Sequence, residues 1–155
     1  MNLDFLRQAI RLSIEKMDVN AGGPFGAVVV RDGEIVGCGW NQVTSTNDPT
    51  AHAEVVAIRD ACSRLKTFSL AGCEIYSSCE PCPLCLAAIY WSRLDRICYA
   101  ASCDDAAAAG FDDRHFYREI RKPTAERAIP MKQALRDEAL VALQAWMKKE
   151  DRIRY

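Results

Sequence analysis

Hydrophobic and polar positions change from helical to strand-like spacing along the chain, and these changes predict most of its elements. The first 17 residues carry apolar side chains at helical spacing, which predicts an amphipathic helix. Its apolar stripe consists of Leu6, Ile10, Ile14 and Met17. Two apolar runs then flank Asp32 and Gly33, and an Asp-Gly pair between such runs is the strongest short-range signal for a β-hairpin.

After the hairpin, helical and strand-like segments alternate. A helix is predicted over residues 51–65, where Thr50 is placed to cap it and the apolar positions are Val55, Ile58, Cys62 and Leu65. Further strands are predicted at 73–78, 96–102 and 129–135, and further helices at 82–94 and 137–150. This order predicts one α/β domain over residues 1–155, a three-layer α/β/α arrangement with a mixed five-stranded sheet.

Length, charge and cysteine content narrow the class of protein. A chain of 155 residues fits one domain with one core, and no apolar run approaches the length that spans a membrane. The charged N-terminal segment is unlike a secretory signal, so eight cysteines indicate a reducing compartment, and we expect a cytoplasmic protein. The net charge of −1 does not suggest a nucleic-acid partner, because nucleic-acid-binding domains usually carry a basic excess.

Three of the cysteines, Cys79, Cys82 and Cys85, lie within the segment SSCEPCPLC. Together with a histidine they could form a closed structural zinc site, whereas two of them would leave a coordination position open for water. Pro81 forces Glu80 into an extended conformation, so Cys79 belongs to the preceding strand and is interpreted as a packed thiol. Cys82 and Cys85 share a face at a helix start that favours their thiolate forms. A dithiol redox motif is the alternative.

The chain has two histidines that could supply a nitrogen ligand. His115 lies in a charged loop and is interpreted as a solvated residue. His52 opens a predicted helix, and Glu54 follows two positions later, where it does not share a face with His52. Glu54 is therefore better placed to approach a water beside a metal than to bind the metal itself.

These residues resemble the signature of the zinc-dependent cytidine deaminase-like superfamily, which combines H-x-E with P-C-x-x-C. The resemblance covers nearly the whole chain and is closest to the small bacterial guanine deaminases. It rests on NAGGPFGAVVV, TSTNDPTAHAEVVAIR, SSCEPCPLCLAAIYW and AAAAGFDD, and on a terminal tyrosine. It implies a cytidine deaminase-like fold, Zn²⁺ on His52, Cys82 and Cys85 with water as fourth ligand, and Glu54 as proton shuttle.

The resemblance also implies a substrate pocket and a partner subunit. The pocket residues are Phe25, Asn41, Trp91 and Asp113. In such enzymes the C-terminal segment, here about residues 137–155, crosses to the other subunit of a homodimer. Tyr155 would then lie over the neighbouring site.

Hydrolysis of guanine to xanthine and ammonia is the expected activity. The metal motif is shared by other deaminases, so cytosine, a pterin, an aminotriazine or tRNA adenosine stays open as a substrate. The neutral charge balance counts against a polyanionic RNA. A non-catalytic zinc-stabilised binding module is the contrasting class, and Glu54 counts against it because a closed structural site does not need such a carboxylate.

Overall fold

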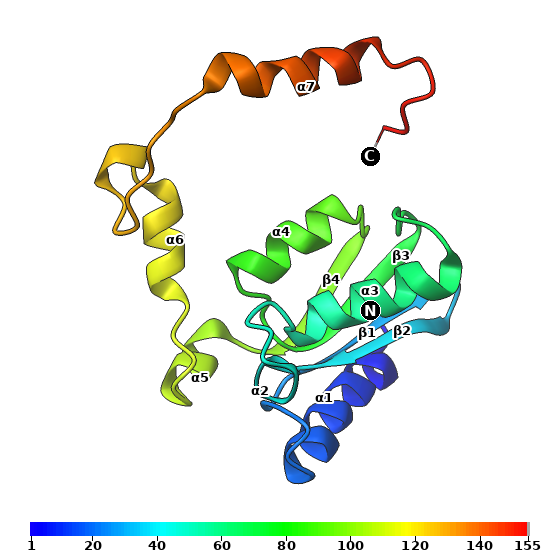
Figure 1. Cartoon of the computed structure of the whole chain (residues 1–155). Coiled ribbons are helices and arrows are strands. Elements are labelled where there is room, and N and C mark those ends of the chain that lie inside the picture. The colour runs from blue at the N-terminus through cyan, green and yellow to red at the C-terminus, as the bar shows by residue number, and fades with distance from the viewer. Residues whose placement is uncertain (155) are drawn as a thin grey trace. The chain divides into compact units, whose positions relative to one another are not determined.

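The structure of the protein is a computed structural model that describes residues 1–154 (Figure 1). The chain divides into two compact units, Met1–Arg114 and the remainder from His115 onward, which are described separately. Within the described part of the chain, no helix combines the length and the apolar character needed to cross a membrane.

A mixed sheet forms the centre of the first unit, as predicted. Its strands are β1 (Gly26–Arg31), β2 (Glu34–Trp40), β3 (Cys73–Cys79) and β4 (Arg96–Ala101), arranged in the order β2-β1-β3-β4. β1 is antiparallel to both β2 and β3, whereas β3 and β4 are parallel. Asp32 and Gly33 connect the hairpin with φ values of 53° and 80°, the positive values that a tight two-residue hairpin turn requires.

The predicted fifth strand at residues 129–135 is wrong, because these residues form no strand. Pro130 has no backbone N–H to donate to a ladder, and Leu135 adopts a positive φ of 52°. The described chain beyond the first unit contains no other strand with which this segment could pair. It contains instead α6 (Arg114–Arg121), the 3-10 helix η1 (Thr124–Glu126) and α7 (Arg136–Lys148).

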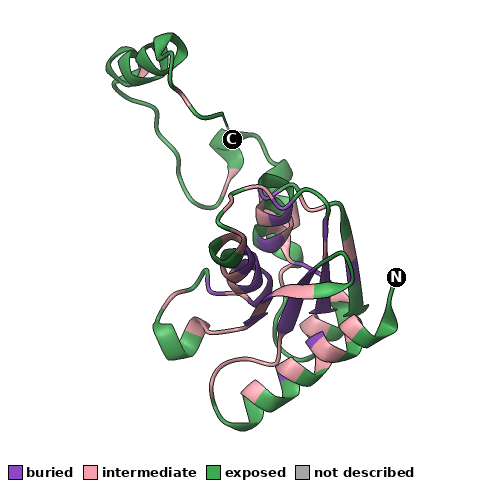
Figure 2. Cartoon of the chain, turned by 90° about the vertical axis from the view of Figure 1, so that its right-hand side faces the viewer, coloured by how far each residue is buried: buried purple, intermediate pink, exposed green. Residues whose placement is uncertain are grey.

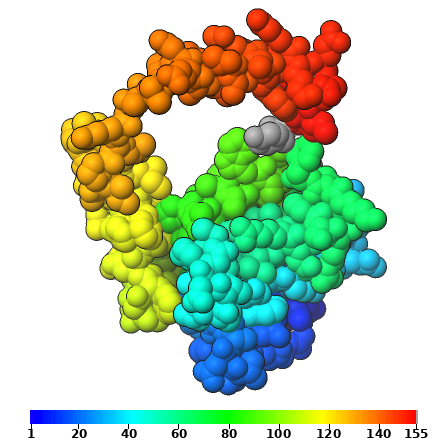
Figure 3. Space-filling model, in the orientation of Figure 1, coloured from blue at the N-terminus to red at the C-terminus, as the bar shows by residue number. Residues whose placement is uncertain are grey.

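Helices cover both faces of the sheet, which confirms the three layers in the first unit (Figures 1 and 2). α1 (Leu3–Asp18) packs on one face, and α3 (Ala53–Leu65) and α4 (Pro83–Trp91) pack on the other. Two short helices, α2 (Val43–Thr46) and α5 (Cys103–Ala108), lie in the connections. In the space-filling view of Figure 3, α2, α3 and α4 form much of the visible face of this unit.

The buried face of α1 differs from the predicted stripe. Ala9 and Ser13 are buried, whereas Ile14 and Met17 are exposed. The helix lies directly on Gly26 of β1, where an added Cβ would stand only 2.4 Å from the carbonyl oxygen of Ala9. Small residues therefore form the contact face, because only they let the helix backbone approach the strand this closely.

Close packing also places the start of α3 at the end of β2. Ala53, Ala57 and Ala61 are fully buried against the sheet. A Cβ on Gly39 would lie 2.2 Å from the carbonyl oxygen of Ala53, so the helix backbone rests on this glycine. His52, rather than the predicted Thr50, is the N-cap of α3 and is consequently held at one end of the sheet.

Candidate metal centre and active site

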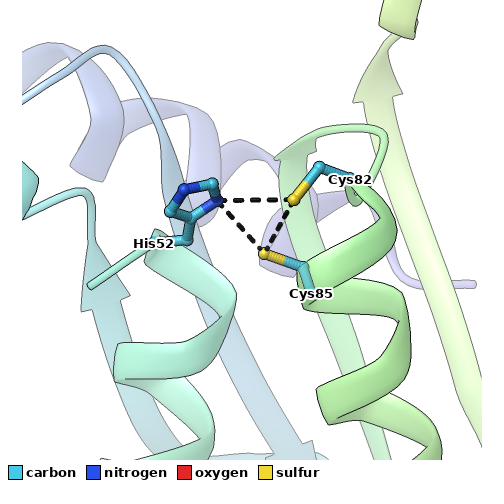
Figure 4. A group of neighbouring side chains, drawn as sticks. All are labelled: His52, Cys82 and Cys85. Atoms are coloured by element: carbon cyan, nitrogen blue, oxygen red, sulfur yellow. Dashed lines mark hydrogen bonds between the residues drawn. The ribbon is translucent and has the colours of Figure 1, made fainter. Parts of the chain in front are cut away.

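Two helix starts carry the predicted metal ligands. His52 and Cys82 are the N-cap residues of α3 and α4 and have extended backbones, with ψ values of 154° and 169°. Cys85 is buried in the first turn of α4, which begins with Pro83. Figure 4 shows the three side chains pointing toward one another from the two helices.

The spacing of these side chains matches a zinc ion. Nδ1 of His52 lies 3.5 Å from Sγ of Cys82 and 3.5 Å from Sγ of Cys85, and the two sulfurs are 3.6 Å apart. A tetrahedral zinc with bonds of about 2.3 Å to sulfur and about 2.0 Å to nitrogen holds such atoms about 3.5–3.8 Å apart. Three protein donors form the group among the described residues, which leaves the fourth position to a non-protein ligand, as in catalytic zinc sites.

The protonation states of the ligands are strongly coupled. Hydrogen bonds to Cys85 and to His52 lower the pKa of Cys82 to about 4, against the opposing effect of burial. The pKa of Cys85 is raised, first by its hydrogen bond with Cys82 and then by burial. The pKa of His52 is raised by its hydrogen bond with Cys82. Zinc binding must therefore displace the Cys85 proton, since only the thiolate is a ligand.

Cys79 stands apart from the metal group, as its place in the strand predicts. It ends β3, and its Sγ donates to the carbonyl oxygen of Ser102 at 3.5 Å. Burial raises its pKa to about 11, so its thiol remains protonated at neutral pH. Its sulfur is not among the donor atoms that lie together at the metal group.

We expect replacement of Cys82 or Cys85 by Ala to remove zinc, while Cys79→Ala retains it. The first two changes delete a donor of the group, whereas the third deletes a thiol bonded to a carbonyl oxygen. Elemental analysis of purified protein should find about one zinc per chain in wild type and in Cys79→Ala. Loss of zinc from Cys79→Ala would show that the site is closed by a third thiol.

Glu54 lies beside the metal group, in the first turn of α3. It is 6% exposed, its Oε1 accepts a hydrogen bond from Oγ of Ser77 at 3.1 Å, and its Oε2 lies 3.3 Å from Sγ of Cys85. Burial raises the pKa of this carboxyl group. A buried carboxyl group with a raised pKa is suited to accept and release a proton near neutral pH.

Asp113 offers an unpaired acceptor. Its Oδ1 is buried and has no hydrogen-bond partner, the one such side-chain atom among the described residues. Burial raises the pKa of Asp113, and the negative charge of Cys82 raises it further, so Asp113 lies within electrostatic reach of the metal group. A buried acceptor without a partner costs free energy, which a bound ligand can recover by donating to it.

Two other predicted pocket residues of this unit, Asn41 and Phe25, lie at the same end of the sheet. Oδ1 of Asn41 accepts from the backbone N–H groups of Gly23 and Val43, both at 3.3 Å, so the side chain presents its amino group as a donor. The Phe25 ring packs edge-to-face against Phe111, with ring centroids 4.9 Å apart. Phe111 was not predicted, although it precedes Asp113 by two residues in the quoted AAAAGFDD segment.

Trp91 and His115 lie elsewhere. Trp91 is the last residue of α4, six positions beyond Cys85 or about 9 Å along the helix axis. Trp91 is 67% exposed and lies at the opposite end of the helix from the metal group. Within a single subunit, Trp91 therefore does not lie beside the metal group. His115 is exposed, as expected of a solvated residue, but it lies in α6 rather than in the predicted loop. Tyr155 lies outside the described residues.

Comparison with known proteins agrees with this geometry. Residues 2–101 match the family described as the cytidine and deoxycytidylate deaminase zinc-binding region. The chain is 54% identical to a guanine deaminase of Bacillus subtilis (strain 168) over 142 residues, which covers 92% of this chain and 91% of that protein. An X-ray structure of guanine deaminase from Bacillus subtilis matches with a TM-score of 0.97 at 51% identity, and covers 100% of this chain and 99% of that chain. A tRNA-specific adenosine deaminase of Aquifex aeolicus is 45% identical over 96 residues, which is 62% of this chain and 60% of that protein. The chain therefore belongs to the family of the cytidine and deoxycytidylate deaminase zinc-binding region.

Proposed function

We propose that this protein is a zinc-dependent guanine deaminase that hydrolyses guanine to xanthine and ammonia. The observation that carries the proposal is the buried Glu54 carboxyl group beside a three-donor zinc group. A structural zinc site has four protein ligands and needs no such carboxyl group, whereas a hydrolytic zinc site needs both an open position and a proton carrier. The extended similarity to guanine deaminase of Bacillus subtilis supports the choice of substrate.

The reaction assigns Glu54 the movement of protons. His52, Cys82 and Cys85 would hold the zinc ion, which would lower the pKa of a bound water to about 7 and so make a nucleophile available at neutral pH. Glu54 accepts a proton from the attacking water and delivers it to N3 of guanine, which makes C2 more electrophilic. After the oxygen adds to C2, Glu54 accepts the proton that remains on this oxygen and transfers it to the 2-amino group. The carbon–nitrogen bond then breaks, ammonia leaves, and water and guanine have become xanthine and ammonia.

Asp113 is proposed to select the base. Its unpaired Oδ1 would accept a hydrogen bond from the N1–H and 2-amino edge that guanine presents and adenine lacks. The amino group of Asn41 would donate to an acceptor on the purine, since its own oxygen already binds two backbone N–H groups. The Phe25 and Phe111 rings would provide an apolar wall for a flat base.

We also propose that the protein is a cytoplasmic homodimer in which the segment of about residues 137–155 is exchanged. α7 buries none of its residues, and Leu143 and Met147 are more than half exposed. Trp91 of the first unit is likewise exposed, and within a single subunit it does not lie beside the metal group. A second copy that covered these surfaces would remove apolar area from water. The eight free cysteines support a reducing compartment.

Deletion of residues 153–155 tests the exchanged segment. We expect turnover to fall without unfolding or loss of zinc, because Ile153 and Tyr155 are proposed to close the partner's site against water. Mixing the truncated protein with the inactive Glu54→Gln variant should restore part of the activity, since hybrid dimers combine one intact Glu54 with one intact segment. A mixture that stays inactive while subunits demonstrably exchange would place the segment over its own site or over none.

The proposed activity itself is tested by product analysis. Zinc-loaded protein incubated with guanine should produce xanthine and ammonia in equal amounts, measured by chromatography and an ammonia assay. Zinc-free protein is the control and should produce neither. Absence of xanthine from the zinc-loaded sample would refute the proposed substrate.

A further inference from the structure

Ser77 is a buried polar residue in an otherwise apolar row. Side chains alternate along a strand, so residues 73, 75 and 77 of β3 point to the same face of the sheet. Cys73 and Ile75 pack there in the core beneath α3 and α4, and Ser77, which is 1% exposed, continues this row. A hydroxyl group buried at such a position needs a hydrogen-bond partner.

The partner of Ser77 is Glu54. Oγ of Ser77 donates to Oε1 of Glu54 at 3.1 Å, the one side-chain hydrogen bond of Ser77 among the described residues. The other carboxyl oxygen, Oε2, is the one beside Sγ of Cys85. The Cys85 thiolate, which is the form that binds zinc, has no proton to share with Oε2. Ser77 is then the side-chain donor that holds Oε1, with Oε2 directed at the metal group, and the backbone N–H of Glu54 also bonds to the carboxyl group.

The backbone holds this donor firmly in place. Ser77 lies in β3, between two neighbouring strands, and is paired with Ala27 of β1 on one side and Tyr99 of β4 on the other. A strand paired on both sides has little freedom to shift, so Oγ is a fixed point against which Glu54 can be oriented.

We infer that Ser77 is a positioning residue for the reaction, which holds Oε1 of Glu54 so that Oε2 remains free and aimed to carry the proton. This inference rests on the proposed deaminase function and adds a residue to it. A misaimed carboxyl group lowers the rate of proton transfer more than the binding of substrate. The effect of losing the Ser77 hydroxyl should therefore appear in kcat rather than in KM.

The test compares zinc-loaded wild type with Ser77→Ala, and with the pair Ser77→Thr and Ser77→Val. Thr and Val have nearly the same shape and differ in the hydroxyl group, so this pair decides the question even where the Ala variant does not fold. Loss of a hydrogen bond to an ionised group should lower kcat for guanine by about 10- to 100-fold in the Ala and Val variants, with KM within about threefold. Ser77→Thr should stay within about threefold of wild type.

Two further measurements separate positioning from a structural role. Ser13→Ala is the matched control, because Ser13 is also buried and donates to a backbone carbonyl oxygen on the opposite face of the sheet. It should leave kcat unchanged. A crystal structure of zinc-loaded Ser77→Ala should show the Glu54 carboxyl group rotated or in two conformers, a result that requires no turnover and stands even where wild type does not deaminate guanine. Equal kcat in the Thr and Val variants, or an unmoved Glu54 in Ser77→Ala, would overturn the inference.

Discussion

Glu54→Gln is expected to lower kcat for guanine by at least about 10²- to 10⁴-fold, the usual contribution of a positioned general acid or base. Gln has nearly the same shape as Glu but cannot accept and release the proton that water must lose and the leaving group must gain. Zinc should remain bound, because Glu54 is not a member of the three-donor group. Steady-state kinetics and elemental analysis of the same preparation give both results.

Glu15→Gln is a suitable control for this prediction. Glu15 is an exposed residue of α1, so its replacement removes a carboxylate without touching the site. It should retain full activity. Near-normal turnover in Glu54→Gln would rule out Glu54 as the proton carrier and, with it, the mechanism proposed above.

Asp113→Ala is expected to abolish most of the activity with guanine. An acceptor built to pair with a polar edge can reject a ligand that lacks the edge by roughly 10⁴-fold or more, because the acceptor is then left unpaired. Removing the carboxylate should therefore lower kcat/KM for guanine severely while zinc content and thermal unfolding stay near those of wild type. The measurement is kcat/KM for guanine in both proteins.

Asp104, an exposed aspartate of the first unit, is a suitable control for Asp113. Asp104 has a side chain that is 78% exposed and pairs with Arg114 at 3.5 Å. Asp104→Ala removes the same charge from the surface and should leave kcat/KM for guanine unchanged. Equal guanine activity in wild type and Asp113→Ala would locate base recognition elsewhere in the pocket.

Local signals were sufficient to predict that His52 and Cys82 stand at helix starts. His52 follows a turn, and Cys82 precedes Pro83, so each was expected at a helix start, and the structure makes both of them N-cap residues. The Asp32–Gly33 turn depends on the same kind of information, because a two-residue hairpin requires positive φ values that few residues tolerate. In these cases the conformation is determined by residues that are adjacent in the chain.

Features that depend on distant residues were missed. The buried face of α1 follows from Gly26, which is eight residues beyond the helix end and admits only a small-residue face. The apolar segment 129–135 had the composition of a strand but no partner with which to pair. Ser77 had no local signal, because a serine in a strand becomes informative only when Glu54 is seen beside it. Spatial neighbours, not propensity, determine these outcomes.

Ammonia release from four substrates tests the central claim most directly. Zinc-loaded protein should be assayed with guanine, adenine, cytosine and a tRNA anticodon stem-loop, each also with protein whose zinc has been removed. We expect rapid, zinc-dependent release from guanine, with xanthine as the product, and release from adenine lower by roughly 10⁴-fold. Preferential release from any of the other three substrates, or equal release with and without zinc, would contradict it.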